Sequence, residues 1–230
     1  MSSITEEFVH IIGKPKKMVL FLHGYEQDAK LINKLIKPMI NNLDNCVVII
    51  PQAPFECEVL PNKNQWYSMH DFDPNDDRKK LKDFNDVVKI YAKSNANIKQ
   101  AFEILIPYIE EKLKKHKIKA KDLYICGFSQ GASLGLYTSL MFKDKIAGAI
   151  SMSGILCPAD VLLDHYKNNF ATLLIHGKAD DYINFEALDF SKKYLEKIGC
   201  VVSTYAIDDT SHFITEDGLL MASHFINAKK

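Results

Sequence analysis

Short runs of uninterrupted apolar residues recur along the chain, separated by longer segments of mixed polarity. A run that is apolar at every position, rather than at alternate positions, is typical of a parallel strand covered on both faces. The pattern predicts five buried strands, at residues 18–22, 46–50, 122–126, 146–150 and 172–176. It predicts a sixth strand near the sheet edge, at Val201–Ile207.

Apolar positions at helical spacing fill the segments between these runs. Leu31, Leu35, Ile36 and Met39 form one stripe, which ends before Asn42. A longer stripe runs over residues 98–113 and contains Pro107, which predicts a kink. Further helices are predicted at residues 130–142, 184–198 and 217–227. Because strands alternate with helices and no linker or repeat interrupts them, residues 1–230 are predicted to be a single α/β domain, with a mostly parallel central sheet and helices on both faces.

Composition narrows the possible partners. Hydrophobic residues make up 47% of the 230 residues, enough for a substantial core. The 29 basic and 29 acidic side chains cancel, which argues against a nucleic-acid partner. No signal-peptide pattern and no apolar stretch of about 18 residues is present, so we expect a cytoplasmic protein without an integral membrane segment, although transient contact with a membrane surface stays open.

Cysteines and charge clusters suggest no further chemistry. The five cysteines are widely spread and show neither paired nor metal-ligand spacing, so neither a disulfide framework nor a metal site is predicted. Six lysines between Lys112 and Lys121 are interpreted as a solvated helix end. The acidic cluster at residues 71–77 lacks the spacing of a calcium loop and is interpreted as surface.

The segment Gly127-Phe128-Ser129-Gln130-Gly131 follows directly on a predicted strand and opens a predicted helix. A sharp strand-to-helix turn strains the serine and lifts its hydroxyl clear of the sheet, and glycine on both sides leaves room for it. The first amides of the helix favour negative charge at the same place. The pattern therefore predicts Ser129 as the nucleophile of a serine hydrolase.

Four histidines follow the serine in the chain: His165, His176, His212 and His224. His176 ends a buried run and is interpreted as bracing a strand end, and His224 lies within a helical pattern. His165 lies between predicted strands. His212 follows the last predicted strand in a polar loop, where a general base must lie to reach the serine. We therefore predict His212 as the base.

The acid partner is expected in the turn after the preceding strand, where Asp180 and Asp181 are adjacent. Adjacent side chains leave a loop in different directions, so only one can face His212, and spacing alone does not choose between them.

The oxyanion hole needs two backbone amides. One belongs to Gln130, directly after the nucleophile. The other is expected after the first predicted strand, where Gly24 lets the main chain turn and presents the amide of Tyr25. The alternative for His23 and Gly24 is a simple strand-end turn with a structural histidine.

A longer series of motifs occurs in order: Leu22-His23-Gly24, Pro51-x-Ala53-Pro54, Trp66-Tyr67, the extended run from Gly127 to Tyr137, His176-Gly177-x-x-Asp180 and the late His212. Over residues 15–225 the chain thereby resembles the carboxylesterase/phospholipase family of α/β-hydrolases, which includes acyl-protein thioesterases and lysophospholipases. The resemblance implies the α/β-hydrolase fold and places the triad acid on Asp180. It also implies His212 as base, oxyanion amides on Tyr25 and Gln130, and an acyl pocket around Trp66.

The chain departs from the family pattern in two loops. It has Tyr25-Glu26-Gln27-Asp28 where the family often has a second glycine, and Asp181 and Asn184 where the family usually has prolines. Both differences affect the mouth of the pocket and hence substrate preference, but neither removes a catalytic group.

Apolar side chains on loops around Ser129 are predicted to bind the acyl chain, although half of them could instead only pack the loops. They are Tyr25, Phe55, Trp66, Met69, Ile155, Leu156 and Phe213. Residues 151–171 are too few for a large lid, so an open, shallow site is expected. Small esters, lysophospholipids and acylated proteins all fit it as substrates. No cofactor is required, and both a monomer and a homodimer are compatible with the sequence.

Two other classes of function compete with this prediction. A dienelactone hydrolase would have the same fold but normally a cysteine nucleophile, and a peptidase usually carries extra specificity domains. A non-enzymatic binding protein on the same scaffold would tend to lose part of the triad, whereas Ser129, Asp180 and His212 are all present. An activated serine therefore distinguishes an enzyme from a binding protein.

Overall fold

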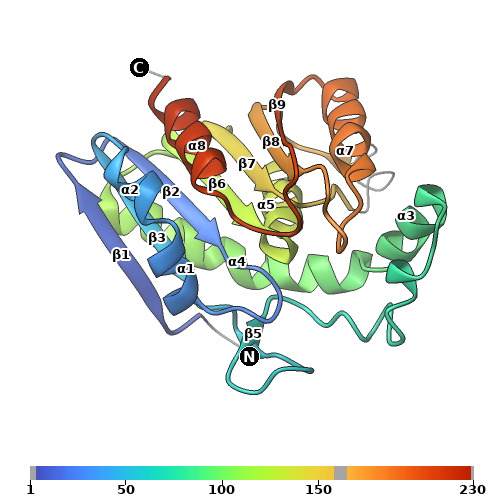
Figure 1. The fold of residues 1–230 in the computed structure, drawn as a ribbon. Coiled ribbons are helices and arrows are strands. Elements are labelled where there is room, and N and C mark those ends of the chain that lie inside the picture. Colours follow the sequence, from blue (N-terminus) through green and yellow to red (C-terminus); the bar gives the residue numbers. More distant parts are fainter. Residues whose placement is uncertain (1–3, 158–164, 229–230) are drawn as a thin grey trace.

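The computed structural model describes residues 4–157 and 165–228. Their centre is a sheet of seven strands in the order β1-β3-β2-β6-β7-β8-β9 (Figure 1). The strands are β1 (Glu7–Ile12), β2 (Lys17–Leu22), β3 (Cys46–Pro51), β6 (Leu123–Phe128), β7 (Gly148–Met152), β8 (Ala171–Gly177) and β9 (Val201–Ile207). All neighbours pair in parallel except β1 and β3. The mostly parallel sheet predicted from the sequence is confirmed.

The six predicted strands are present, and β9 lies at one edge of the sheet as expected. The strand at the opposite edge, β1, was not predicted. Its residues do not form a continuous apolar run, and its side chains are only half-buried or exposed. An edge strand with one neighbour needs no such run, so the criterion for fully covered strands does not detect it.

Helices cover both faces of the sheet, as predicted (Figure 1). One face packs against α1 (Ala29–Leu35), α2 (Lys37–Asn41) and α8 (Glu216–Ala228). The other packs against α4 (Asn95–His116), α5 (Gln130–Met141) and α7 (Glu186–Lys197), and buried residues of α3 (Phe84–Ala92) join the same core. Alternate residues of β2 divide between the two cores: Val19 faces one and Leu20 the other.

Several local expectations need correction. The first predicted helix is two helices, because Pro38 lies in the first turn of α2 and a new helix begins there. Helix α4 continues through Pro107 without interruption, and a bend at this residue stays a prediction. Helix α3 and a small hairpin, β4 (Phe55–Glu56) with β5 (Asn64–Gln65), were not predicted.

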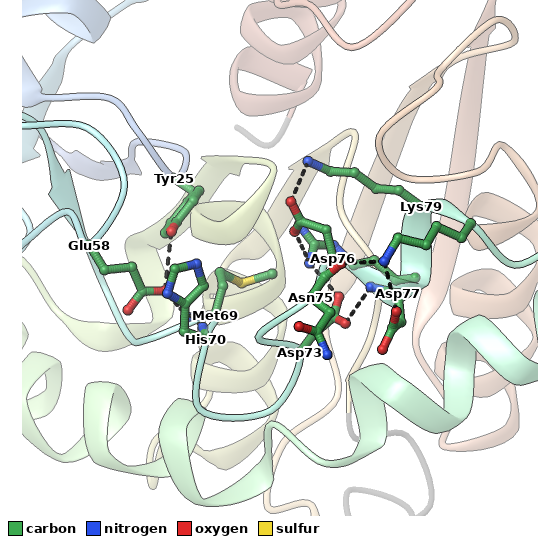
Figure 2. A network of polar contacts seen from close by, with 11 residues as sticks. Tyr25, Glu58, Met69, His70, Asp73, Asn75, Asp76, Asp77 and Lys79 are labelled. Atoms are coloured by element: carbon green, nitrogen blue, oxygen red, sulfur yellow. Dashed lines mark hydrogen bonds and ion pairs between the residues drawn. The ribbon is translucent and has the colours of Figure 1, made fainter.

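Two charged side chains interpreted as surface are buried. Lys112 is 7% exposed, and its Nζ contacts Oε2 of Glu7 at 2.9 Å. Asp73, which is labelled in Figure 2, is 2% exposed and pairs with Arg78. In each case an oppositely charged partner compensates the burial of the charge: Arg78 lies five positions after Asp73, whereas Glu7 lies 105 positions before Lys112. The partner at position 7 is far away in the chain, which is why the local charge pattern did not reveal it.

All five cysteines lie within the described residues, where they are buried and free of disulfides. Across residues 4–157 and 165–228, none of the helices has both the length and the apolar character required to cross a membrane. The segment 158–164, part of the region predicted to lack a large lid, lies outside the described residues.

Candidate active site

The predicted catalytic residues lie just after the carboxyl ends of three strands, on the same side of the sheet. Ser129 directly follows β6, Asp180 follows β8, and His212 follows β9. In a parallel sheet these carboxyl ends share one edge, so segments far apart in the sequence meet there (Figure 1). The loop carrying Gly24 follows β2, which pairs with β6 and therefore lies beside the serine turn.

Ser129 occupies a strained turn between β6 and α5. Its backbone has φ 54° and ψ −118°, a conformation that residues with a Cβ rarely adopt. The flanking glycines are required by close backbone packing. A Cβ on Gly127 would lie 2.4 Å from the carbonyl oxygen of Gly131, and a Cβ on Gly131 would lie 2.3 Å from that of Leu22. The sharp turn expected from the sequence is therefore present.

One chain of hydrogen bonds links the three predicted triad side chains. The Ser129 hydroxyl lies 2.9 Å from Nε2 of His212, and Nδ1 of His212 lies 2.8 Å from Oδ2 of Asp180. With Nδ1–H donating to the carboxylate, Nε2 is free to accept the proton of the serine. His165 and His224 are exposed. His176 is buried and reaches the triad residues at Asp180, with its Nε2 3.2 Å from Oδ2 of that carboxylate.

The two adjacent aspartates, which spacing left unresolved, have different partners. Asp180 is bound to His212, whereas Oδ1 of Asp181 accepts a hydrogen bond from the Ser211 hydroxyl at 2.6 Å. Burial by itself raises the pKa of the Asp180 carboxyl, but hydrogen bonds from His176 and His212 hold that pKa well below its usual range. The carboxylate therefore stays ionised beside the imidazole.

Two aromatic rings contact the His212 imidazole. The Phe128 ring lies 4.8 Å from it between centroids, and the Tyr182 ring stacks on it at 5.2 Å and 25°. The Lys79 ammonium in turn lies 5.0 Å from the centre of the Tyr182 ring. Sequence reasoning missed Tyr182, although its place two residues after Asp180 was a usable signal.

The predicted oxyanion loop after β2 is held by a buried histidine. His23 is 0% exposed; its Nδ1 donates to the Gly24 carbonyl at 2.8 Å, and its Nε2 accepts from the Ala53 amide at 3.0 Å. Burial lowers the pKa of His23 to about 4, so this imidazole is neutral at pH 7. In a planar trans peptide the Tyr25 N–H points opposite to the Gly24 carbonyl, so His23 fixes the direction of that amide.

Gln130, whose backbone amide is predicted to be an oxyanion donor, also binds the 66–67 segment through its side chain. Its Oε1 accepts from the Trp66 amide at 2.9 Å, and its Nε2 donates to the Tyr67 carbonyl at 2.9 Å. The Trp66 indole is 1% exposed and donates to the His23 carbonyl at 2.9 Å. Trp66 is thus hydrogen-bonded to the predicted oxyanion loop, and its role in binding an acyl chain stays a prediction.

The other predicted pocket residues differ in exposure. Met69 is 8% exposed, Leu156 is 1% exposed, and Phe55 is half-buried. Phe213, next to the base, is 69% exposed. The apolar surface available at the base is therefore contributed by Phe213 and by Tyr182, which is 54% exposed.

The carboxylate of Glu58, which the sequence analysis did not single out, joins the predicted oxyanion loop at Tyr25 to the turn at residues 68–70. Glu58 accepts hydrogen bonds from the Tyr25 hydroxyl at 3.1 Å and from the amides of Met69 and His70, each at 2.8 Å (Figure 2). Ser68 adds a hydroxyl donor at 2.7 Å. Burial alone raises the pKa of Glu58, but these donors bring it below its ordinary value. No local motif identifies such a residue.

We expect Glu58→Gln to lower kcat/KM about ten-fold, because a neutral amide loses part of the charge-assisted bonding that holds Tyr25 and the 68–70 turn together. Tyr25→Phe removes only the hydroxyl bond and serves as the matched variant, with an expected loss of about three-fold. Steady-state kinetics on a chromogenic ester measures both. Wild-type kinetics in Glu58→Gln would mean that this carboxylate does not organise the site.

Within residues 4–157 and 165–228, no group of three or more histidine, cysteine, aspartate or glutamate side chains is placed to hold a metal ion.

A mostly parallel sheet that carries a hydrogen-bonded serine, histidine and aspartate at its strand ends defines the class as the α/β-hydrolases. A family model described as phospholipase/carboxylesterase matches residues 5–230. The chain therefore belongs to the phospholipase/carboxylesterase family and is a carboxylic ester hydrolase, as the sequence resemblance implied.

The chain also resembles two relatives of known name and one solved structure. The chain is 26% identical to acyl-protein thioesterase 1 of Debaryomyces hansenii, over 94% of this chain and 92% of the relative. It is 26% identical to acyl-protein thioesterase 1 homolog 1 of Dictyostelium discoideum, over 91% and 88%. The crystal structure of esterase PE8 superposes with a TM-score of 0.83 at 23% identity, covering 98% of both chains. This structural likeness supports the fold.

Proposed function

We propose that the protein cleaves esters or thioesters of apolar acyl chains through an acyl-enzyme formed on Ser129. The observation that carries this proposal is the unbroken chain of hydrogen bonds from the Ser129 hydroxyl through His212 to Asp180, at 2.9 and 2.8 Å. These side chains come from three loops separated by up to 83 residues, so their alignment supports a catalytic rather than a purely structural arrangement.

In the first half of the reaction, Ser129 attacks the carbonyl carbon while Nε2 of His212 takes the hydroxyl proton. Asp180 keeps the proton of the imidazole on Nδ1 and stabilises the imidazolium that forms. His212 then gives its proton to the leaving alcohol or thiol. In the second half, water attacks the acyl-enzyme by the same route and releases the carboxylic acid.

The negative charge that develops on the carbonyl oxygen is assigned to the amides of Tyr25 and Gln130. Gln130 is the first residue of α5, so its N–H has no partner within the helix and is available to an oxyanion. The hydrogen bond from His23 to the Gly24 carbonyl supports the same role for Tyr25. Losing one such donor costs about 10²–10³-fold in rate in comparable enzymes.

The acyl chain is assigned to the apolar residues beside this charge, namely Phe55, Trp66, Met69, Leu156 and Phe213. The exposed Phe213 and Tyr182 rings support an open entrance rather than an enclosed tunnel. Two relatives that match most of the chain are named acyl-protein thioesterases, which favours S-acylated proteins among the candidate substrates. Lysophospholipids and small esters offer the same bond next to an apolar chain.

A series of kcat/KM values over acyl chain length, measured for matched esters and thioesters, tests this proposal. Each buried CH₂ contributes about 0.8 kcal/mol, so kcat/KM is expected to rise about three- to four-fold per methylene until the apolar surface is filled. Because an open site tolerates different leaving groups, thioesters are expected to be cleaved with the same chain-length dependence.

The concentration of active enzyme in these assays is measured by labelling with an alkyl fluorophosphonate, which reacts only with an activated serine. Hydrolysis that is flat across chain length would contradict the apolar pocket and leave the serine assignment intact. Absence of both hydrolysis and labelling would instead indicate a binding protein on a hydrolase scaffold.

A further inference from the structure

A second histidine contacts the carboxylate of the proposed triad. His176 lies in β8, is 2% exposed, and places Nε2 2.8 Å from the Ile183 carbonyl and 3.2 Å from Oδ2 of Asp180. Both neighbours are acceptors, so Nε2 must carry the proton. The Phe185 ring packs edge-on against the imidazole at 6.0 Å and 79°. The sequence pattern suggested only that this side chain braces a strand end.

We propose that His176 is a positioning residue for ester hydrolysis, which holds the Asp180 carboxylate in the orientation that His212 requires. This inference rests on the proposed function of Ser129, His212 and Asp180. His176 does not touch the substrate in this scheme and acts only through Asp180.

The carboxylate of Asp180 is fixed at both oxygens. Oδ1 accepts from the amides of Tyr182 at 3.0 Å and Ile183 at 2.9 Å. Oδ2 has Nδ1 of His212 at 2.8 Å and Nε2 of His176 at 3.2 Å. The side chain is 0% exposed, so these protein groups replace its water shell. A carboxylate with its acceptor positions filled in this way cannot rotate without breaking several bonds.

His176 also secures the loop that supplies two of these donors. Ile183 donates its N–H to Asp180 and accepts the Nε2–H of His176 at its carbonyl. The same ring nitrogen on β8 is thus hydrogen-bonded to the Ile183 peptide at 2.8 Å and lies 3.2 Å from the carboxylate that this peptide wraps. Since β8 is an interior strand of the sheet, this anchor is more rigid than one supplied by a loop.

The effect of His176 on the charge of Asp180 has a definite direction. The N–H of His176 beside Oδ2 stabilises the carboxylate anion and helps to keep the pKa of Asp180 low. Without it, the carboxylate attracts a proton on His212 more strongly. Among the described residues, titratable or charged groups near this pair include Tyr91 beside Asp180, Asp181 through Ser211, and Lys79 through Tyr182. None of them changes when His176 is replaced.

Two substitutions separate the donor from the volume of the side chain. His176→Leu keeps an apolar side chain against Phe185 but removes the donor. His176→Gln places an amide N–H near the position of Nε2 and so restores it. The readouts are kcat, KM and the pH profile of kcat/KM, each expressed per fluorophosphonate-labelled site so that loss of folded protein does not enter.

We expect His176→Leu to lower kcat about ten-fold with KM changed by less than about two-fold, because the Asp180 carboxylate is no longer held in the orientation that His212 requires. The acid limb of its kcat/KM profile is expected about half a pH unit higher than in the wild type, where protonation of the base ends activity. His176→Gln should return kcat to within about three-fold of the wild type and restore the acid limb.

A folded His176→Leu enzyme with unchanged kcat and an unchanged acid limb would overturn the proposal, as would a Gln variant as impaired as Leu. If the Leu variant does not fold, ¹⁵N NMR of histidine-labelled wild-type protein decides. Nε2 of His176 is expected to carry a proton, and a neutral imidazole protonated only at Nδ1 would overturn the proposal. Wild-type hydrolysis and labelling test the function of Ser129 separately, so failure of one is distinguishable from failure of the other.

Discussion

Replacing Ser129 by alanine is expected to lower kcat by about 10⁶-fold, because loss of a nucleophile in a serine triad removes nearly the whole contribution of the triad. The variant should also fail to react with an alkyl fluorophosphonate, since no hydroxyl remains next to Nε2 of His212. Esterase assays at high enzyme concentration and intact-protein mass spectrometry measure the two effects. The substitution removes a single oxygen from a half-buried side chain, so the fold should persist.

The turn geometry supplies a second variant that distinguishes loss of chemistry from loss of structure. Ser129 has a φ of 54°, which glycine adopts without strain. Ser129→Gly should therefore be as inactive as Ser129→Ala. Its free energy of unfolding, measured by thermal unfolding, should be about 1 kcal/mol higher than that of Ser129→Ala. Ser203→Ala, at an exposed position in β9, controls for serine replacement in general. Substantial hydrolysis by both Ser129 variants would mean that another group is the nucleophile.

The parts of the fold that the sequence predicts are those in which one local property determines the outcome. Buried parallel strands require continuous apolar runs, so the six predicted strands were recognisable. The order of these strands places Ser129, Asp180 and His212 at one edge of the sheet. The strand β1 escaped prediction because an edge strand needs no such run.

The parts that escaped prediction depend on partners distant in the sequence. Lys112 pairs with Glu7 across 105 positions, and the charge pattern around Lys112 contains no trace of this contact. Glu58 is recognisable only once the Tyr25 loop and the 68–70 turn are placed beside it. The same limit left Asp180 and Asp181 equivalent by spacing, because only the folded loop shows which carboxylate faces His212.

Asp180→Asn is expected to lower kcat by about 10⁴-fold, the loss found when the acid of a serine triad becomes an amide. The geometry explains why the amide cannot adapt. Two backbone amides donate to Oδ1, so Oδ1 of the asparagine must stay there and its NH₂ group must take the place of Oδ2. That group then meets Nδ1 of His212, which has to become an acceptor. The proton moves to Nε2, and the base can no longer accept the proton of Ser129.

The same amide would also point an N–H at the Nε2–H of His176. The asparagine NH₂ group would therefore face a donor on both His176 and His212, where the carboxylate is an acceptor for both. Asp181→Asn is the matched control: its Oδ1 can still accept the Ser211 hydroxyl, and kcat should change by less than about three-fold. Single-turnover kinetics with a chromogenic ester, together with the rate of fluorophosphonate labelling, measures both variants. Equal losses in the two, or more than a tenth of wild-type activity in Asp180→Asn, would reassign the acid, because only the carboxylate bound to Nδ1 can hold His212 in its basic tautomer.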